Sequence, residues 1–304
     1  MRPGRPPAGR GPVPSQAVGA GDIVAATWRP PDGPQSTAHI PAVPSPSPAP
    51  ELLATPAGDV PLQEYRLGLA GRAWSVLHTG AVLSWVDEQH YLSEDRERLP
   101  YGAALWPAAI ALAHEVAARP DDWRGRTVLE LGAGTGLPGI VAASLGARVV
   151  QTDKHALALA LCARNGARNG VPAAPEPTPD ASPNASPNDA PPPGAVRYRR
   201  ADWAAWDVGA RFDWVLGADV CYAEGQHDAL RAIFARNLAP GGRVLLTDPF
   251  RAASLRLFEA MEADGWAVGV SRWSVGLAEP EPGRDPDETA PRGVGAFLLA
   301  PPAA

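Results

Sequence analysis

Carboxylates at the ends of apolar segments are the residues of this sequence best suited to chemistry. Asp153, Asp202, Asp219 and Asp248 each end or follow a short run of strand-forming residues. Parallel strands end at one edge of a sheet, and α/β folds bind their ligands there. Carboxylate oxygens accept hydrogen bonds from hydroxyl, amino and ammonium groups. We therefore expect these four side chains to form one ligand-binding edge.

A glycine-rich segment, residues 126–139, precedes all four acids. Its apolar run at 127–131 is followed by glycines at positions 132, 134, 136 and 139, and Pro138 suits the first turn of a helix. Glycine allows left-handed backbone and close approach to a ligand. The new helix directs unpaired N–H groups at the same place. This strand–turn–helix predicts a cradle for a nucleotide or nucleoside.

Apolar periodicity predicts the elements that position these residues. Strand-like and helix-like segments alternate, which indicates a parallel sheet with helices on both faces. The expected strands are 73–79, 127–131, 147–153, 196–202, 212–219, 243–248, 266–275 and 294–300. The expected helices are 107–118, 138–145, 156–169, 227–238 and 253–263. We expect the segment 81–86 to be the hairpin partner of the first strand or a helix start.

The last two expected strands have no helix between them, so one of them must insert antiparallel. We predict the α/β class, with a Rossmann-like, doubly wound, seven-stranded sheet that is mostly parallel and has an antiparallel last strand. The four acids and the glycine turn would then share the carboxyl edge of the sheet.

Proline content divides the chain into a tail and a domain. Residues 1–60 consist largely of Pro, Ala, Gly and Ser and cannot bury enough apolar surface to offset chain entropy. We expect a disordered Pro-rich tail there, although early arginines also give it some transit-peptide character. A Pro-rich insert at 171–195 is expected to be disordered as well. The remaining chain, 61–304, is expected to be one domain with an N-terminal hairpin and helix extension.

The overall composition narrows the choice of partners. A formal net charge of −6 gives no support for a nucleic-acid backbone binder. No apolar run is long enough to span a membrane, and the N-terminus lacks the apolar core of a secretory signal, so we expect a cytoplasmic monomer. Cys162 and Cys221 lack metal-ligand spacing, so no metal is expected, and Cys221 suits packing better than nucleophilic attack.

Two cofactors compete for the glycine turn. Gly134, Gly136 and Gly139, with Asp153 after the next strand, satisfy the pattern of a nicotinamide dinucleotide site. Glu130 stands inside the preceding strand, where a carboxylate is unfavourable beside a pyrophosphate. It suits the ammonium and sulfonium groups of S-adenosyl-L-methionine. We favour S-adenosyl-L-methionine and retain the nicotinamide oxidoreductase as an alternative.

The sequence Glu-Leu-Gly-Ala-Gly-Thr-Gly at 130–136, with an acid ending the next strand, resembles the class I methyltransferases. Three further features resemble the family 16 methyltransferase-like lysine methyltransferases over about residues 62–300. They are Tyr-Gly-Ala-Ala-Leu-Trp-Pro at 101–107, Asn165 with Asn169, and Asp-Val-Cys-Tyr at 219–222. Asp-Pro-Phe-Arg at 248–251 resembles the branch that modifies the electron-transfer flavoprotein beta subunit.

The resemblance implies roles at the cofactor. Glu130 and the glycine turn would hold the methionine end and the ribose side, and Asp153 would accept hydrogen bonds from the ribose hydroxyls. Asp202 would receive the adenine amino group, with Trp203 packed on the ring. The implied cofactor-binding set is Trp106, Glu130, Gly132, Ala133, Gly134, Gly136, Asp153, Asp202, Trp203 and Asp219.

At the acceptor, the resemblance implies catalytic roles for Asp219 and Tyr222, which would face the substrate amine. Structural alternatives stay open for three residues. Trp106 could be core, Asp202 could cap a helix, and Asp248 could serve the turn before Pro249.

The sequence as a whole therefore predicts an S-adenosyl-L-methionine-dependent N-methyltransferase of a protein side chain, lysine or arginine. One alternative is a small-molecule amine or heterocycle as the methyl acceptor, because the same cradle serves both. The non-enzymatic alternative is a cofactor-binding interaction protein without activity.

Overall fold

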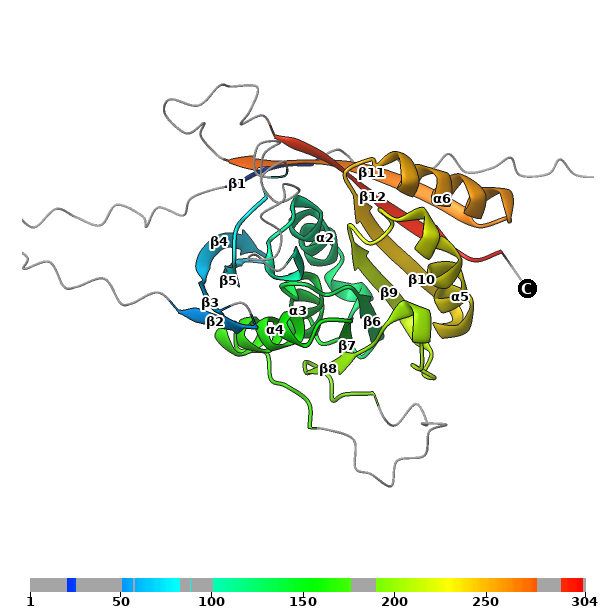
Figure 1. Ribbon diagram of the computed structural model, residues 1–304. Helices are drawn as coiled ribbons and strands as arrows, with labels where there is room; N and C mark the ends of the chain where they lie inside the picture. Colours follow the sequence, from blue (N-terminus) through cyan, green and yellow to red (C-terminus); the bar gives the residue numbers. More distant parts are fainter. Residues whose placement is uncertain are drawn as a thin grey trace, which may run out of the picture.

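The computed structural model describes residues 21–25, 51–56, 58–82, 88, 101–175, 190–277 and 291–302, with the backbone alone for 21–25. Its centre is one eight-stranded sheet in the order β1-β11-β12-β10-β9-β6-β7-β8 (Figure 1). The strands are β1 (Gly21–Ala25), β6 (Thr127–Leu131), β7 (Arg148–Asp153), β8 (Val196–Arg200), β9 (Phe212–Ala218), β10 (Leu238–Asp248), β11 (Ala267–Leu277) and β12 (Arg292–Ala300). The predicted Rossmann-like α/β fold is confirmed.

Strand direction agrees with the prediction. β6, β7, β8, β9 and β10 are mutually parallel, and β12 runs antiparallel to both of its neighbours, β10 and β11. The chain moves from β6 to β7 and β8 on one side, then returns to β9 on the other side of β6. The carboxyl ends of β6 and β9 thus flank a topological switch point, where sheets of this kind bind ligands.

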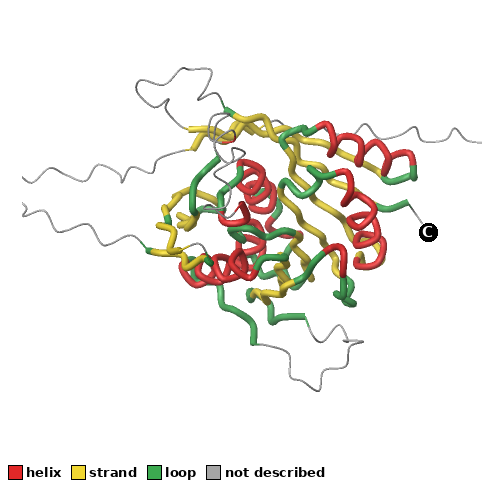
Figure 2. The backbone as a smooth tube through the Cα atoms, viewed as in Figure 1, coloured by secondary structure: helices red, strands yellow, loops and turns green. Residues whose placement is uncertain are grey.

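Helices cover both faces of the sheet (Figure 2). The helices α2 (Pro107–Ala117), α3 (Leu137–Ser144) and α4 (Ala156–Arg168) lie on one face, and α5 (His227–Asn237) and α6 (Ala252–Ala263) lie on the other. Two apolar clusters result because strand residues alternate between the faces. Leu129 and Leu131 pack with the α5 and α6 side, whereas Val128 packs with α2 and α3.

Short single-turn helices and two small sheets complete the description. The single turns are η2 (Tyr101–Ala103), η3 (Pro120–Asp122), η5 (Trp203–Ala205) and η6 (Glu224–Gln226). The small sheets are the hairpin of β2 (Leu52–Thr55) with β3 (Gly58–Pro61) and the hairpin of β4 (Gln63–Leu69) with β5 (Arg72–His78). Within the described residues, no helix combines the length and apolarity that crossing a membrane requires.

Three sequence-based expectations need correction. The hairpin partner of β5 is the preceding β4, because Gly71 turns the chain back with a φ of 73°. Of the segment 81–86, expected as that partner or as a helix start, residues 83–86 lie outside the described residues. The tail 1–60 contributes β1, which pairs with β11, and β2. The ends of the insert 171–195 are ordered, since Val171 and Ala195 are buried, whereas 176–189 lie outside the described residues.

Candidate functional site

The glycine turn after β6 has the left-handed backbone that its glycines predict. Gly132, Gly134 and Gly136 have φ values of 60°, 56° and 79°, a left-handed region that side chains disfavour. Space is short as well. A Cβ at Gly132 would lie 3.1 Å from Cγ1 of Val220, and a Cβ at Gly136 would lie 2.9 Å from Sγ of Cys162. The turn therefore presents bare backbone at the switch point.

Glu130 lies beneath this turn and is buried. Its Oε2 accepts hydrogen bonds from Nε2 of Gln151 at 2.6 Å and from the backbone N–H of Gly139 at 3.1 Å, in the first turn of α3. Burial raises the pKa of Glu130 to about 8. These contacts place the Glu130 carboxyl group against the start of α3, under the glycine turn. Its role toward the methionine end of the cofactor stays a prediction.

Gly139 allows the first turn of α3 to pack closely on the sheet. A Cβ at this position would overlap Oε2 of Glu130 and would lie 2.7 Å from Nε2 of Gln151. α3 can approach β6 and β7 this closely only with glycine here. The literal dinucleotide spacing, which needs Gly139 at the ligand, is therefore explained by helix packing.

Asp153 ends β7 beside the turn. Its Oδ2 accepts a hydrogen bond from the N–H of Gly134 at 3.2 Å, and its Oδ1 accepts one from the N–H of His155 at 2.9 Å. The N–H of Ala133 donates to the carbonyl of Thr152 at 3.0 Å. The acid and the glycine turn are thus fixed to each other through backbone contacts.

Asp202 and Trp203 follow β8 at the same edge. Asp202 is exposed, and its Oδ1 accepts a hydrogen bond from the N–H of Ala204 at 3.0 Å, so it caps η5. The structure thus contains the contact expected of the capping alternative for Asp202. Trp203 is half-buried, and its ring lies 3.7 Å from a Cβ built on Gly132. The indole therefore borders the glycine turn.

Aromatic rings border the other side of the site. Trp106 precedes α2, and its ring centroid lies 4.4 Å from that of Tyr101. Tyr222 is 43% exposed, and its ring lies 6.2 Å from Tyr101. Burial, with the nearby charge of Asp219, raises the pKa of Tyr101. Trp106 also lines the pocket described next, so it is both a packing residue and a wall of the site.

Asp219 follows β9 and is buried with a φ of 51°. Its carboxylate forms two parallel hydrogen bonds with Arg251, from Nε to Oδ1 at 2.8 Å and from Nη2 to Oδ2 at 2.8 Å. These bonds, with the charge of Glu88, hold the pKa of Arg251 above its usual range. The predicted acceptor acid is therefore paired with an arginine of the same chain.

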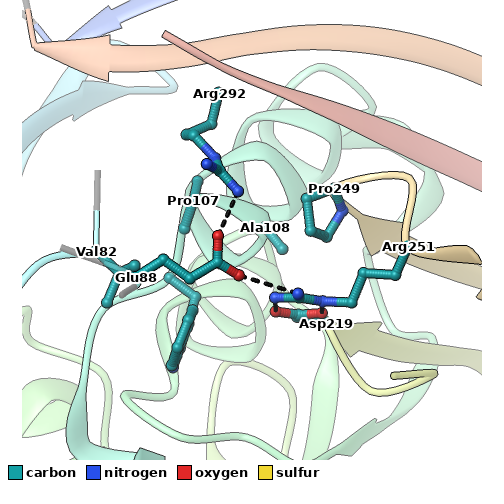
Figure 3. Close-up of a pocket in the computed structure, with 9 residues that line it drawn as sticks. Val82, Glu88, Pro107, Ala108, Asp219, Pro249, Arg251 and Arg292 are labelled. Atoms are coloured by element: carbon teal, nitrogen blue, oxygen red, sulfur yellow. Dashed lines mark hydrogen bonds and ion pairs between the residues drawn. The ribbon is translucent and has the colours of Figure 1, made fainter. Parts of the chain in front are cut away.

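Glu88 and Arg292 extend this pairing across a narrow pocket that Trp106 and Pro107 also line (Figure 3). Oε1 of Glu88 lies 2.9 Å from Nη1 of Arg251, and Oε2 of Glu88 accepts a hydrogen bond from Arg292. Sequence reasoning assigned no role to Glu88, Arg251 or Arg292. The signal for Arg251 was its place in the Asp-Pro-Phe-Arg run, whereas the contacts of Glu88 and Arg292 span 204 residues and leave no local pattern.

Asp248 supports Arg251 from the end of β10. Its Oδ1 accepts a hydrogen bond from the backbone N–H of Arg251 at 2.6 Å, and its Oδ2 accepts one from the hydroxyl of Ser254. Burial raises the pKa of Asp248 to about 6. These contacts support the structural alternative for Asp248, in which its carboxyl group holds the turn that follows β10.

Cys221 and His114 are packing residues in the structure. Cys221 is buried, and burial raises the pKa of its thiol. His114 of α2 packs against Trp273 with ring centroids 5.7 Å apart, and burial lowers the pKa of His114 to about 4.

The site and the fold together define a class. The strand order β8-β7-β6-β9-β10-β12-β11, a glycine turn at the switch point and an acid ending the adjacent β7 are the features of a Rossmann-like fold with a ligand-binding switch point.

Comparison with known proteins makes the class more specific. Residues 87–173 match the family model described as lysine methyltransferase. The predicted resemblance to the family 16 lysine methyltransferases is confirmed over this segment. The segment contains the glycine turn, Asp153 and Glu88, and it ends before the acceptor-side residues Asp219 and Arg251.

Individual relatives agree with this match. Protein N-lysine methyltransferase METTL21A of Danio rerio is 44% identical over 27% of this chain and 38% of its own length. EEF1A lysine methyltransferase 3 of Mus musculus is 32% identical over 51% of this chain and 59% of its own length. The chain thus spans less than two thirds of either relative.

A solved putative RNA methyltransferase from Pyrococcus horikoshii aligns over 64% of this chain and 85% of its own, with 17% identity and a TM-score of 0.45.

Proposed function

We propose that this protein is an S-adenosyl-L-methionine-dependent N-methyltransferase that modifies a protein side chain, with lysine as the first candidate. One observation carries the proposal, namely the adjacency of the glycine turn and Asp219. Leu131 pairs with Gly217 in the register of β6 and β9, so both features end neighbouring parallel strands. Relatives named as protein lysine methyltransferases support lysine as the acceptor.

The residues at the glycine turn fit the proposed cofactor. Gly132 and Gly134 are partly exposed and have no side chain of their own, so a ligand can approach their backbone, and Asp153 offers carboxylate oxygens suited to two vicinal hydroxyls. The Trp203 ring gives a flat apolar surface for a purine. When bound, S-adenosyl-L-methionine supplies an activated methyl group on a sulfonium centre.

The acceptor side contributes alignment and charge. Asp219 can orient an incoming N–H group, and Tyr101 and Tyr222 can confine the stem of a long side chain. Transfer to nitrogen needs little beyond correct alignment, which can supply about 7–11 kcal/mol of the barrier. An amine must also be uncharged to react, and free lysine has a pKa near ~10.4.

An arginine side chain is the second candidate acceptor. The specific observation in its favour is that Asp219 already binds a guanidinium, that of Arg251, through two parallel bonds. A 53-residue match at 45% identity to histone-arginine methyltransferase METTL23 of Mus musculus supports keeping it.

Radiolabelling with methyl-labelled S-adenosyl-L-methionine in extract of the source organism tests the proposal. We expect a labelled protein band whose modified residue, found by mass spectrometry, is lysine, or arginine for the second candidate. Label confined to the small-molecule fraction would favour a small amine acceptor. The absence of label, with calorimetry that detects no S-adenosyl-L-methionine binding, would remove the methyltransferase proposal altogether.

We also propose that the protein is cytoplasmic and monomeric. The net charge of −6 is compatible with a soluble, non-associating surface. Cell fractionation with an antibody against the protein tests its location. Sedimentation of the purified full-length chain at several concentrations tests its oligomeric state.

A further inference from the structure

Four charged side chains, Asp219, Arg251, Glu88 and Arg292, form a continuous chain of ion pairs along one wall of the pocket. Arg251 binds Asp219 through two nitrogens and Glu88 through the third, and Glu88 binds Arg292 through its other oxygen (Figure 3). We call these four residues the charge tetrad. They come from four separate parts of the chain, so their meeting is a property of the fold alone.

The tetrad is electrically balanced and poorly solvated. It contains two carboxylates and two guanidinium groups, and the side chains of Asp219 and Glu88 are each only 5% exposed. Arg251 is 27% exposed and Arg292 is 22% exposed. Charges in such a place interact more strongly than charges in water. The other titratable groups that act on Arg251 are Asp248 and Tyr101. Tyr222 lies beside Tyr101, and Cys221 lies near Asp219 and Asp248.

This balance matters for an amine acceptor. A carboxylate alone beside an amine favours the ammonium form, which has no lone pair for attack. Asp219 does not stand alone, because a permanent cation lies 2.8 Å from both of its oxygens. A second cation at Asp219 would be repelled by Arg251, whereas an uncharged amine would not. Arginine suits this role because it stays protonated at all relevant pH values.

We propose that Arg251, held between Asp219 and Glu88, is a positioning residue that balances the charge of the acceptor pocket, so that the acceptor amine is bound in its uncharged, reactive form. This inference rests on the proposed methyltransferase function. It assigns a role to the pairing of Asp219 with Arg251 and requires no additional residue or ligand in the pocket.

The test uses variants that change the charge of the tetrad in opposite directions. Arg251→Met removes a positive charge, Glu88→Gln removes a negative charge, and Arg251→Lys is the matched control that keeps the charge. The kcat for methylation of the labelled protein found in extract is measured from pH 6.5 to 9.5, because kcat reports the pKa of the enzyme–substrate complex. Binding of S-adenosylhomocysteine, measured by calorimetry, checks that the cofactor side is intact.

We expect opposite shifts. The apparent pKa of the kcat profile should rise by at least one unit in Arg251→Met, which makes the variant at least tenfold slower at pH 7.5. It should fall in Glu88→Gln, and it should stay within about 0.3 unit of the wild type in Arg251→Lys. Glu88→Gln preserves the size of the side chain, so it tests the inference even if Arg251→Met fails to fold.

Profiles that keep the wild-type pKa in both Arg251→Met and Glu88→Gln, with methylation still detectable, would overturn this inference and leave the proposed function standing. A fall in rate by one factor at every pH would do the same, because that is the result of a merely structural role. A wild-type protein that binds S-adenosylhomocysteine but methylates nothing would overturn the proposed function and this inference together.

Discussion

Asp219 illustrates how one residue can be fixed for function at some local cost. Its φ of 51° lies in the left-handed region, which costs a non-glycine residue of order 1–3 kcal/mol. Its N–H donates to the carbonyl of Thr247 at 2.8 Å, and its carboxylate is held by Arg251. These contacts determine where the carboxylate lies, so its position does not depend on a flexible rotamer.

Asp219→Asn is expected to lower turnover at least tenfold while changing the affinity for S-adenosylhomocysteine less than threefold. The amide keeps the size of the side chain but loses the charge, and its NH₂ group cannot accept a bond from Arg251. Methylation assays and calorimetry measure the two effects. Asp207→Asn, at a side chain that is 68% exposed, is the control and should retain full turnover. A fully active Asp219→Asn variant would contradict the assignment.

Gly139→Ala is expected to destabilise the fold by about 1–3 kcal/mol, as overpacking of a tight core does. The new methyl group would overlap the Glu130 carboxyl group and crowd Gln151. Urea unfolding measures the loss. Gly68→Ala is the matched control, because a Cβ there meets nothing within 4 Å, and it should change stability by no more than about 0.5 kcal/mol. Equal stability of the two variants would show that α3 can shift without cost.

Single residues with a local sequence pattern could be predicted, whereas residues defined by long-range contacts could not. The glycine turn and the end-of-strand acids were predictable because glycine at left-handed positions and carboxylates at strand ends are local patterns. The pairing of Arg251 with Asp219, 32 residues apart, was not, because no local rule selects one arginine from many. The contacts of Glu130 with Gln151 and Gly139 were missed for a related reason, since these partners lie on β7 and α3 and no local pattern selects them.

Two asparagines of α4, Asn165 and Asn169, bind the backbone of β5 through their side-chain amides, as the backbone of a neighbouring strand would. Oδ1 and Nδ2 of Asn165 bond the N–H and the carbonyl of Leu77 at 2.8 Å and 3.0 Å. Asn169 does the same with Ser75 at 3.0 Å and 2.7 Å. Four helical residues rise about 6 Å and two strand residues about 6.6 Å, so the two spacings match.

The same helix connects the hairpin to the site. Nδ2 of Asn165 also donates to the carbonyl of Thr135, inside the glycine turn, at 2.9 Å. The two asparagines were noticed in the sequence as part of the family resemblance, with no role attached. Their function in the fold could not be predicted while β5 was paired with the wrong partner, since the bonded positions belong to the open edge of the β4–β5 hairpin.

Asn165→Ala is expected to destabilise the protein by about 3 kcal/mol or more, because it leaves three buried backbone groups without their partner. Urea unfolding measures the total, and hydrogen exchange at the Leu77 amide should accelerate. Arg164→Ala is the control on the same helix. Arg164 is exposed and binds only the carbonyl of Leu52 among the bonds described, so its removal should cost under about 0.5 kcal/mol. Unchanged exchange at Leu77 in Asn165→Ala would contradict this role.

For the whole molecule, the sequence predicted the central strands of the sheet but not the edge strand β1. Alternating strands and helices restrict a chain to few topologies, and strands without an intervening helix require an antiparallel insertion. The mostly parallel sheet and its antiparallel strand therefore followed from periodicity, whereas the order of the strands came from the structure. β1 did not, because five residues in a Pro-rich tail pair with β11 some 250 positions later, and nothing near Gly21–Ala25 specifies that partner.

The pH dependence of stability is a property of the whole molecule with contributions of opposite sign. The pKa values of Glu130 and Asp248 are raised by burial to about 8 and about 6. Folding therefore favours their protonated forms, and this stabilisation is lost as pH rises through those values. Burial lowers the pKa values of His78 and His114 to about 4, so their contribution is present above about pH 6.5 and is lost as pH falls toward 4.

Above pH 6.5 the largest change of ionisation among these four groups is that of Glu130 in the folded protein, so the free energy of unfolding should fall between pH 6.5 and 8. The two histidines are half protonated in the unfolded chain at pH 6.5 and oppose this fall, which leaves a net decrease of about 1 kcal/mol. Urea unfolding at both values measures the difference. In Glu130→Gln, which keeps an oxygen for the Gly139 N–H and cannot ionise, the fall should nearly vanish. Glu224→Gln at an exposed ion pair is the control and should fall as the wild type does. A parallel fall in Glu130→Gln would mean that the Glu130 carboxyl is already ionised in the folded protein at pH 6.5, and that its charge reaches the glycine turn after all.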